Sequence, residues 1–135
     1  MDSQYIDSLW ERARHTLDNA RANLLLLPDT AANRAYYAAF FAVSALFASQ
    51  EKIFKKHAGV RSAVHKDLIH SGQWPASLGD DYDTLIGLRE IADYGALKHA
   101  GPEEAEDAIR ASERILRAVH AMNPGLFPLG NISEK

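Results

Sequence analysis

The sequence predicts an all-α fold, an antiparallel up-and-down bundle of four main helices plus one shorter helix. Three observations predict this class. Apolar residues recur every three or four positions along most of the chain, and no segment alternates with the period of two that indicates a strand. Residues 30–50 are apolar on nearly all sides, as in a buried central helix. Pro28, Pro75 and Pro102 fall between the periodic segments.

The overall composition fits one folded domain. The chain has 135 residues, 24% of them charged and 47% hydrophobic, which is the balance of a globular protein rather than a disordered one. We assign residues 1–123 to the helical bundle and residues 124–135 to a C-terminal tail. Cysteine is absent, which excludes disulfides and thiolate chemistry, and the N-terminus lacks the pattern of a signal peptide. A cytoplasmic location is therefore expected.

The first predicted helix covers residues 3–27. Its apolar face is formed by Ile6, Leu9, Ala13, Leu17, Ala20, Leu24 and Leu27. Pro28 is expected to end this helix, and Asp29 or Thr30 to cap the next one through a side-chain oxygen. The connection is so short that the first two helices should be antiparallel neighbours.

The second predicted helix, residues 30–50, is expected to be the central helix against which the others pack. Small residues form one narrow stripe at Ala31, Ala35, Ala38, Ala42, Ala45 and Ser49, and large residues form another at Tyr36, Phe40, Val43 and Phe47. The small stripe lets a neighbouring backbone approach closely, and the large stripe fills volume. The uncharged run between Arg34 and Glu51 is shorter than the ~20 residues of a membrane span, so a core helix without membrane contact is expected.

Two further helices follow a basic connector at residues 52–56. A short helix is predicted over residues 57–71, with inward residues Val60, Ala63, Val64 and Leu68. Residues 71–79 should form a loop whose Trp74 packs back onto the bundle. Asp80 or Asp81 should open the next helix, which ends before Gly95 and packs through Leu85, Leu88, Ile91 and Ala92.

The last predicted helix begins at Pro102 and ends near Asn123. Acidic residues occupy its first turns and basic residues its later turns, an order that suits the helix dipole. Its inner face comprises Ala105, Ala108, Ser112, Ile115, Val119 and Met122. The tail that follows contains two prolines and two glycines and should run as a loose strap.

The charge distribution is uneven along the chain. Net charge is −3, which gives no global electrostatic case for nucleic-acid binding. Residues 52–70 nevertheless carry five Lys or Arg against one acid, a balance of +4, whereas residues 80–107 carry nine acids against two bases, a balance of −7. This asymmetry favours contacts with another chain or another domain.

Chemical motifs of the common enzyme classes are absent. The sequence has no phosphate-binding glycine loop, no HExxH and no GxSxG. The six histidines do not fall at i, i+4 on one helix, so we expect neither a metal site nor a cofactor.

A polar stripe on the fourth predicted helix is the first candidate site. Tyr82, Ile86, Arg89 and Asp93 share one face, and Arg89 and Asp93 are one turn apart. Two interpretations stay open. The spacing favours an ordinary surface ion pair of ~0.3–0.5 kcal/mol, but the carboxylate could instead hold the arginine so that its guanidinium faces a phosphate.

A basic face on the short helix is the second candidate. It comprises Lys55, Lys56, His57, Arg61, His65 and Lys66. Such a face can bind phosphates, but it is more often solvated or directed toward an acidic partner. The arginines at 110, 114 and 117 are expected to be solvated, and the hydroxyls of Tyr36 and Tyr37 to be structural.

Four segments together resemble the HEPN domain family, in its small stand-alone prokaryotic branch. They are NRAYYAAFFAVSALF at 33–47, KKHAGVRSAVHKDLIHSG at 55–72, LREIADYG at 88–95 and EEAEDAIRASERILRAV at 103–119. The resemblance implies a helical bundle, a homodimer and a minimal nucleotidyltransferase partner, as in toxin–antitoxin-like two-component systems. Many members are metal-independent ribonucleases with an Arg-x4–6-His motif near the dimer seam, and some carry a tyrosine that the partner modifies with AMP.

The sequence departs from that ribonuclease motif after Arg89. Asp93 stands where the histidine is expected, Tyr94 follows it, and the next histidine is His99. We therefore expect an interaction module whose groove contains Arg89, Asp93 and Tyr94, with Lys55, His57 and Arg61 available to bind a partner or nucleotide. Tyr94 matches the modified tyrosine loosely. The alternatives are a ribonuclease that uses Arg89 with His99 or His57 on RNA, and a nucleotide binder without a protein partner.

Overall fold

The computed structural model describes residues 2–94 and 99–130, without the side chains of residues 92–94. Its elements are α1 (Ser3–Ala22), α2 (Pro28–Ser49), α3 (His57–Ala63), the π-helical segment η1 (Val64–Ile69), α4 (Ala76–Tyr94) and α5 (Pro102–Met122). The described residues contain helices and connections but no strand. The predicted all-α bundle is therefore confirmed.

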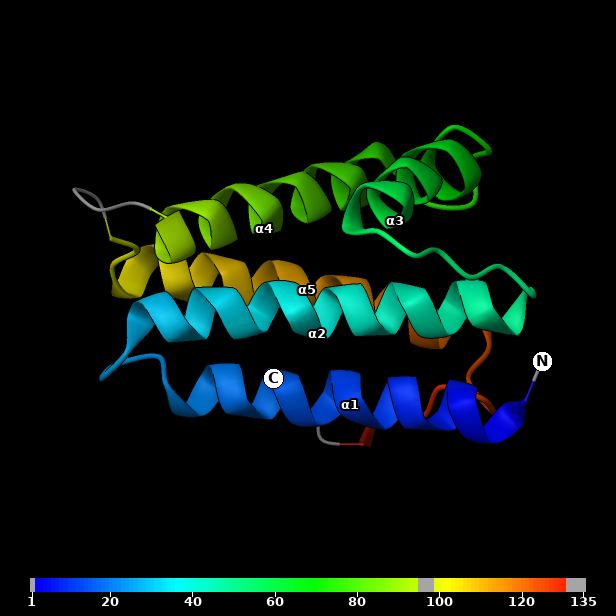
Figure 1. Ribbon diagram of the computed structural model, residues 1–135, viewed down its shortest axis with the longest axis horizontal. Helices are drawn as coiled ribbons and strands as arrows, with labels where there is room; N and C mark the ends of the chain where they lie inside the picture. Colours follow the sequence, from blue (N-terminus) through cyan, green and yellow to red (C-terminus); the bar gives the residue numbers. More distant parts are fainter. Residues whose placement is uncertain (1, 95–98, 131–135) are drawn as a thin grey trace.

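Helix α2 lies at the centre of the bundle. Figure 1 shows α1 and α4 on opposite sides of α2, both antiparallel to it, and α5 packed behind it. Five alanines of the predicted small stripe are fully buried, and of the large stripe Tyr36, Val43 and Phe47 are buried while Phe40 is half-buried. Small side chains let the neighbouring helices approach α2 closely, which explains how it can contact all three of the other long helices.

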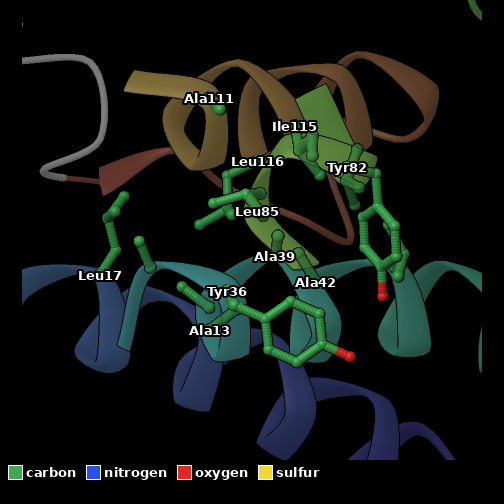
Figure 2. Packing of buried hydrophobic residues seen from close by; sticks show 14 of the residues in the cluster. Ala13, Leu17, Tyr36, Ala39, Ala42, Tyr82, Leu85, Ala111, Ile115 and Leu116 are labelled. Carbon is green, nitrogen blue, oxygen red and sulfur yellow. The ribbon is translucent and has the colours of Figure 1, made fainter. Parts of the chain in front are cut away.

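The core fills the space where α1, α4 and α5 converge on α2. Figure 2 shows Ala39 and Ala42 of α2 together with Leu85 of α4 and Ile115 and Leu116 of α5, all fully buried. Leu17 of α1 closes the core on another side.

The connection between α1 and α2 differs from the prediction. Helix α1 ends at Ala22, where the side chain of Asn23 bonds back to Asn19, and Pro28 opens α2 instead of closing α1. Proline is well tolerated there because the first helical N–H has no partner within the helix. Leu27 consequently lies in the turn and is exposed, and Asp29 does not cap α2 but binds residues 99 and 100.

The predicted short helix is two segments, since α3 is α-helical and η1 is π-helical. All four of its predicted inward residues are buried, as is Trp74. Helix α4 begins at Ala76, earlier than Asp80, and buries Leu78, Tyr82 and Leu85. The prediction that Ile91 faces the core was wrong, because at 100° per residue it lies almost opposite that face; Ile91 is 37% exposed.

Helix α5 and the chain after it follow the prediction in outline. The predicted inner face of α5 is buried, with Met122 at its half-buried end. The following residues are held more firmly than a loose strap: Phe127 is fully buried against Trp10, whose indole N–H donates to the carbonyl of Pro128 at 2.8 Å. His120 Nδ1 also lies 2.7 Å from the carbonyl of Phe127.

Within the residues that the structure describes, no helix combines the length and the apolar character needed to cross a membrane.

Candidate functional site

A cavity of about 150 Å³ lies where α2, α3 and α4 meet, and we call it the Arg89 pocket. Its lining residues are Tyr36, His57, Ala58, Arg61, Ile86 and Arg89. Each helix supplies a different part: α2 the aromatic ring, α3 the imidazole and one guanidinium, and α4 the second guanidinium. The fold thus brings together side chains that are up to 53 positions apart in the sequence.

Arg89 packs against aromatic rings of α2. Its guanidinium carbon lies 4.8 Å from the ring centre of Tyr36 and 6.0 Å from that of Tyr37, and Nη1 donates to the hydroxyl of Tyr37 at 3.4 Å. A cation over an aromatic face is attracted by the ring quadrupole, more strongly when it is partly removed from water. These contacts orient the half-buried Arg89.

His57 joins α3 to the aromatic cluster. Its Nδ1 lies 2.8 Å from the hydroxyl of Tyr36, and its ring stacks on Phe40 with 4.3 Å between ring centres. Burial, and then the charge of Arg89, lower the pKa of His57 below its ordinary value. The imidazole is therefore neutral at pH 7. Its tautomer depends on whether Nδ1 or the Tyr36 hydroxyl donates the hydrogen bond between them.

Tyr36, which contacts His57, and its neighbour Tyr82 keep their protons at neutral pH. Burial raises the pKa of Tyr36, partly opposed by the neighbouring Tyr82 hydroxyl and the positive charge of Arg89. Burial also raises the pKa of Tyr82 well above its ordinary value, and the rings of the two tyrosines are 6.0 Å apart. Tyr36 is thus a hydroxyl partner for His57 rather than a phenolate.

Arg61 reaches the pocket while bound to α4. Its Nε lies 3.1 Å from Oδ1 of Asp83, and the same oxygen lies 2.9 Å from Nε2 of His65. The predicted basic face of the short helix is therefore partly paired with a carboxylate, that of Asp83. Lys55 and Lys56 are exposed and do not line the pocket.

Of the predicted site residues, the structure brings Arg89, His57 and Arg61 together. The histidine beside Arg89 is His57, whereas His99 is 71% exposed and pairs with Asp29, eight positions before Tyr37 on α2. His99 is not among the residues that line the Arg89 pocket, and a joint role of Arg89 and His99 stays a prediction. The side chains of Asp93 and Tyr94 lie outside the described residues, so the Arg89–Asp93 pair stays a prediction.

Tyr36, Tyr37 and Asp83 are the site residues whose roles the sequence did not indicate. The two tyrosines were expected to be structural, yet one lines the pocket and the other binds Arg89. Their location on an apolar helix gives no sign of this, because the same spacing also describes core residues. Asp83 is one of several acids in its segment, and its contacts depend on how α3 docks.

The arginines of α5 were expected to be solvated, and among the described side chains Arg110 and Arg114 form ion pairs. Arg114 binds Asp81 of α4 through two contacts of 2.8 and 3.0 Å, and Arg110 binds Glu106 one turn earlier on α5. Both are exposed, and neither lines the Arg89 pocket.

The Arg89 pocket is suited to a phosphate group. Two guanidinium groups supply fixed positive charge and forked donors, and the histidine adds a neutral group that can gain a proton when an anion binds. A larger cavity of about 370 Å³ between α1 and α5 is less suited to an anion, since Arg21 and Glu113 on its wall pair at 2.7 Å. Among the described side chains, no three His, Asp or Glu converge as metal ligands would.

Comparison with known proteins places this arrangement in context. A family model described as the HEPN domain matches residues 6–122. A UPF0332 protein of Thermotoga maritima is 35% identical over 125 residues, which cover 90% of this chain and 93% of that protein.

Two further relatives add to this context. A protein of Methanocaldococcus jannaschii named "Putative toxin MJ0142" is 33% identical over 103 residues, which cover 75% of this chain and 69% of that protein. The crystal structure of TT1696 from Thermus thermophilus superposes with a TM-score of 0.71 at 24% identity. That alignment covers 86% of this chain and 96% of that one, and at this identity it supports the fold alone.

Proposed function

The chain belongs to the HEPN domain family, and we propose that it is a toxin-like interaction module that binds a nucleotide phosphate in the Arg89 pocket. The observation that carries this proposal is the convergence of Arg61, Arg89 and His57 on one cavity of about 150 Å³. Phosphate is, with carboxylate, one of the anions that forked guanidinium donors recognise. The similarity to a protein whose name includes the word toxin supports the toxin-like part.

The nucleotide part of this proposal is tested by calorimetry with inorganic phosphate, AMP and ATP. Arg89→Gln should weaken binding about 10- to 100-fold, because it removes hydrogen bonds between charged groups. Arg110→Gln is the matched control, since Arg110 is an exposed arginine on α5 that pairs with Glu106. Equal affinity of the wild type and Arg89→Gln would refute the pocket as the ligand site.

The partner proposed for this module is a minimal nucleotidyltransferase, and the proposed assembly is a homodimer. Family membership and the uneven charge along the chain support both. Co-purification from the native cell should recover a nucleotidyltransferase, and light scattering should give a dimer mass at micromolar concentration. Recovery of the chain without such an enzyme would reject the partner, and a monomer mass would reject the dimer.

A metal-independent ribonuclease is the second candidate, and the position of His57 favours it. The fold places His57 beside Arg89, so the pocket joins an arginine that could bind a phosphate to an imidazole that is neutral at pH 7. In such a site the arginine would stabilise charge that develops on the phosphate, and the imidazole would transfer a proton.

Two histidine variants test this second candidate with RNA substrates. The single-stranded and structured RNAs should be cut by the wild type and by His99→Asn, but not by His57→Asn or Arg89→Gln. His99→Asn is the matched control because His99 lies outside the pocket and pairs with Asp29. Absence of cleavage by the wild type, or cleavage that survives His57→Asn, would reject the assignment.

A further inference from the structure

We propose that Asp83 is a positioning residue of the Arg89 pocket, which fixes the α3 wall of the pocket against α4. This inference rests on the proposed phosphate-binding function of that pocket. The α3 wall consists of His57, Ala58 and Arg61, and the opposite wall consists of Ile86 and Arg89. The distance between the walls therefore depends on how α3 is attached to α4.

The polar part of this attachment is concentrated on one oxygen atom. Oδ1 of Asp83 lies 3.1 Å from Nε of Arg61 and 2.9 Å from Nε2 of His65, which is one turn further along the same segment. One carboxylate thus binds two successive turns of the α3–η1 segment. Because Arg61 uses Nε for this contact, its two terminal nitrogens stay available to a ligand in the cavity.

The close approach of η1 to α4 depends on a glycine. A Cβ atom at Gly79 would lie 3.0 Å from Cε1 and 3.2 Å from Nδ1 of His65, and 3.2 Å from Cγ1 of Ile69. These contacts are tighter than side chains normally tolerate, so any larger residue at position 79 would displace η1 or the His65 ring. Gly79 and Asp83 therefore serve the same contact, one by leaving room and the other by hydrogen bonding.

Few other polar contacts hold the α3 wall. Helix α3 is only seven residues long, and among the described side chains its other polar link to the bundle is the bond of 2.8 Å between His57 and Tyr36. A short helix has little stability of its own and takes its position from tertiary contacts. Loss of the Asp83 contacts should therefore move Arg61 and His57 relative to Arg89.

The charge of Asp83 and its hydrogen bonds should have opposite effects on phosphate affinity. A carboxylate beside an anion site repels the ligand, so removing its charge alone should strengthen phosphate binding. Removing its hydrogen bonds should weaken binding because Arg61 loses its orientation. Asp83→Asn removes the charge and keeps an acceptor oxygen, Asp83→Ala removes both, and Gly79→Ala disturbs the geometry without changing any charge.

The experiment measures inorganic phosphate affinity and the NMR shifts of the His57 ring protons, which report its stacking on Phe40. Asp83→Ala and Gly79→Ala should each weaken phosphate binding about threefold to tenfold and shift the His57 resonances in the ligand-free protein. Asp83→Asn should bind as well as the wild type or better. Asp81→Ala is the matched control, because Asp81 is an aspartate of the same helix that pairs with Arg114 away from the pocket.

Each result decides the proposal. Unmoved His57 resonances in both Asp83→Ala and Gly79→Ala would overturn it, as would phosphate binding in Asp83→Ala as tight as in Asp83→Asn, which lacks the same charge. If Asp83→Ala does not fold, the phosphate affinity and the His57 resonances of Gly79→Ala test the proposal on their own. If the wild type binds no phosphate, the proposed function fails, while the His57 resonances still show whether Asp83 positions the α3 wall.

Discussion

The side of α2 that faces α1 and α5 and the side that faces α3 and α4 are built differently. Toward α1 and α5, long regular helices meet through buried alanines and aliphatic residues, and Arg21 there is paired with the nearly buried carboxylate of Glu113 at 2.7 Å. Toward α3 and α4, the chain forms a short helix, a π-helical segment and a cavity lined by guanidinium and aromatic groups. The cavity on the first side carries a paired arginine and glutamate, whereas the cavity on the second side is lined by two arginines and a histidine.

This difference has a physical origin in the side chains that α2 presents. Alanines allow helix backbones to approach one another until dispersion contacts are dense. Tyr36, Tyr37 and Phe40 hold the neighbouring elements further away, and their rings can accept a cation or an imidazole on their faces. Stability is therefore expected to come mainly from the first side and ligand binding from the second.

The largest expected effect is on the packed core. Phe47→Ala should lower the free energy of unfolding by about 3–5 kcal/mol, because a fully buried ring is replaced by a cavity. Urea unfolding followed by circular dichroism measures this change. A loss below about 1 kcal/mol would show that the core collapses around the missing ring and that the close packing is less important than its burial suggests.

A smaller loss is expected from overfilling the alanine stripe. Ala42→Leu should destabilise the fold by about 1–3 kcal/mol, since Ala42 is fully buried between helices. Ala121→Leu adds the same atoms at an exposed position of α5 and serves as the control. Equal unfolding midpoints for the two variants would contradict the close approach of helices along this stripe.

On the pocket side, the expected change is in titration rather than in global stability. Arg89→Gln should raise the pKa of His57, because one of the two causes that lower it is the charge of Arg89. Titration of the His57 ring by NMR measures the shift, with Arg110→Gln as the charge-matched control. An unchanged His57 pKa would indicate that burial alone lowers it.

The same lowered pKa predicts how stability depends on pH. A histidine whose pKa is lower in the folded state contributes stability that is present above its unfolded pKa of about 6.5 and is lost as the pH falls through the folded value. Below pH about 6.5, the wild type should therefore lose stability faster than His57→Gln. Parallel pH profiles of urea unfolding would contradict this sign. The effect should be small because His57 is only partly buried.

The smallest effect is expected in the turn between α1 and α2. Leu26 is 87% exposed, so Leu26→Ser should change the free energy of unfolding by less than about 0.5 kcal/mol. Thermal unfolding is sufficient to measure it. A larger loss would mean that this turn is covered by another chain under the conditions of measurement.

Much of the fold follows from local patterns in the sequence. The number of helices, the central place of residues 30–50 and the inward residues of the short helix agree with the structure, because burial imposes a helical period that the sequence displays directly. The errors lie at the boundaries and in the direction of Ile91, which is 37% exposed. A proline can end one helix or begin the next, and the sequence alone does not show which of these Pro28 does. In the structure it begins α2.

The candidate site could be predicted only in part. Arg89, His57 and Arg61 were singled out by residue type and by family resemblance, but the histidine in the pocket is His57, and His99 pairs with Asp29 elsewhere on the molecule. The distance along the chain favoured neither histidine, since both lie in segments whose position depends on packing against α2. Asp83 could not be distinguished from the other acids near it before its contacts were known.

By itself, the sequence determined that this chain forms helices, which faces of them are buried and to which family it belongs, because periodicity and family motifs are properties of neighbouring residues. Only the tertiary structure decided which side chains share a cavity. Docking of α3 across α2 and α4 brings His57 and Arg61 to Arg89 through long-range packing and a single carboxylate. Contacts of that kind depend on the whole bundle, so no local stretch of sequence specifies them.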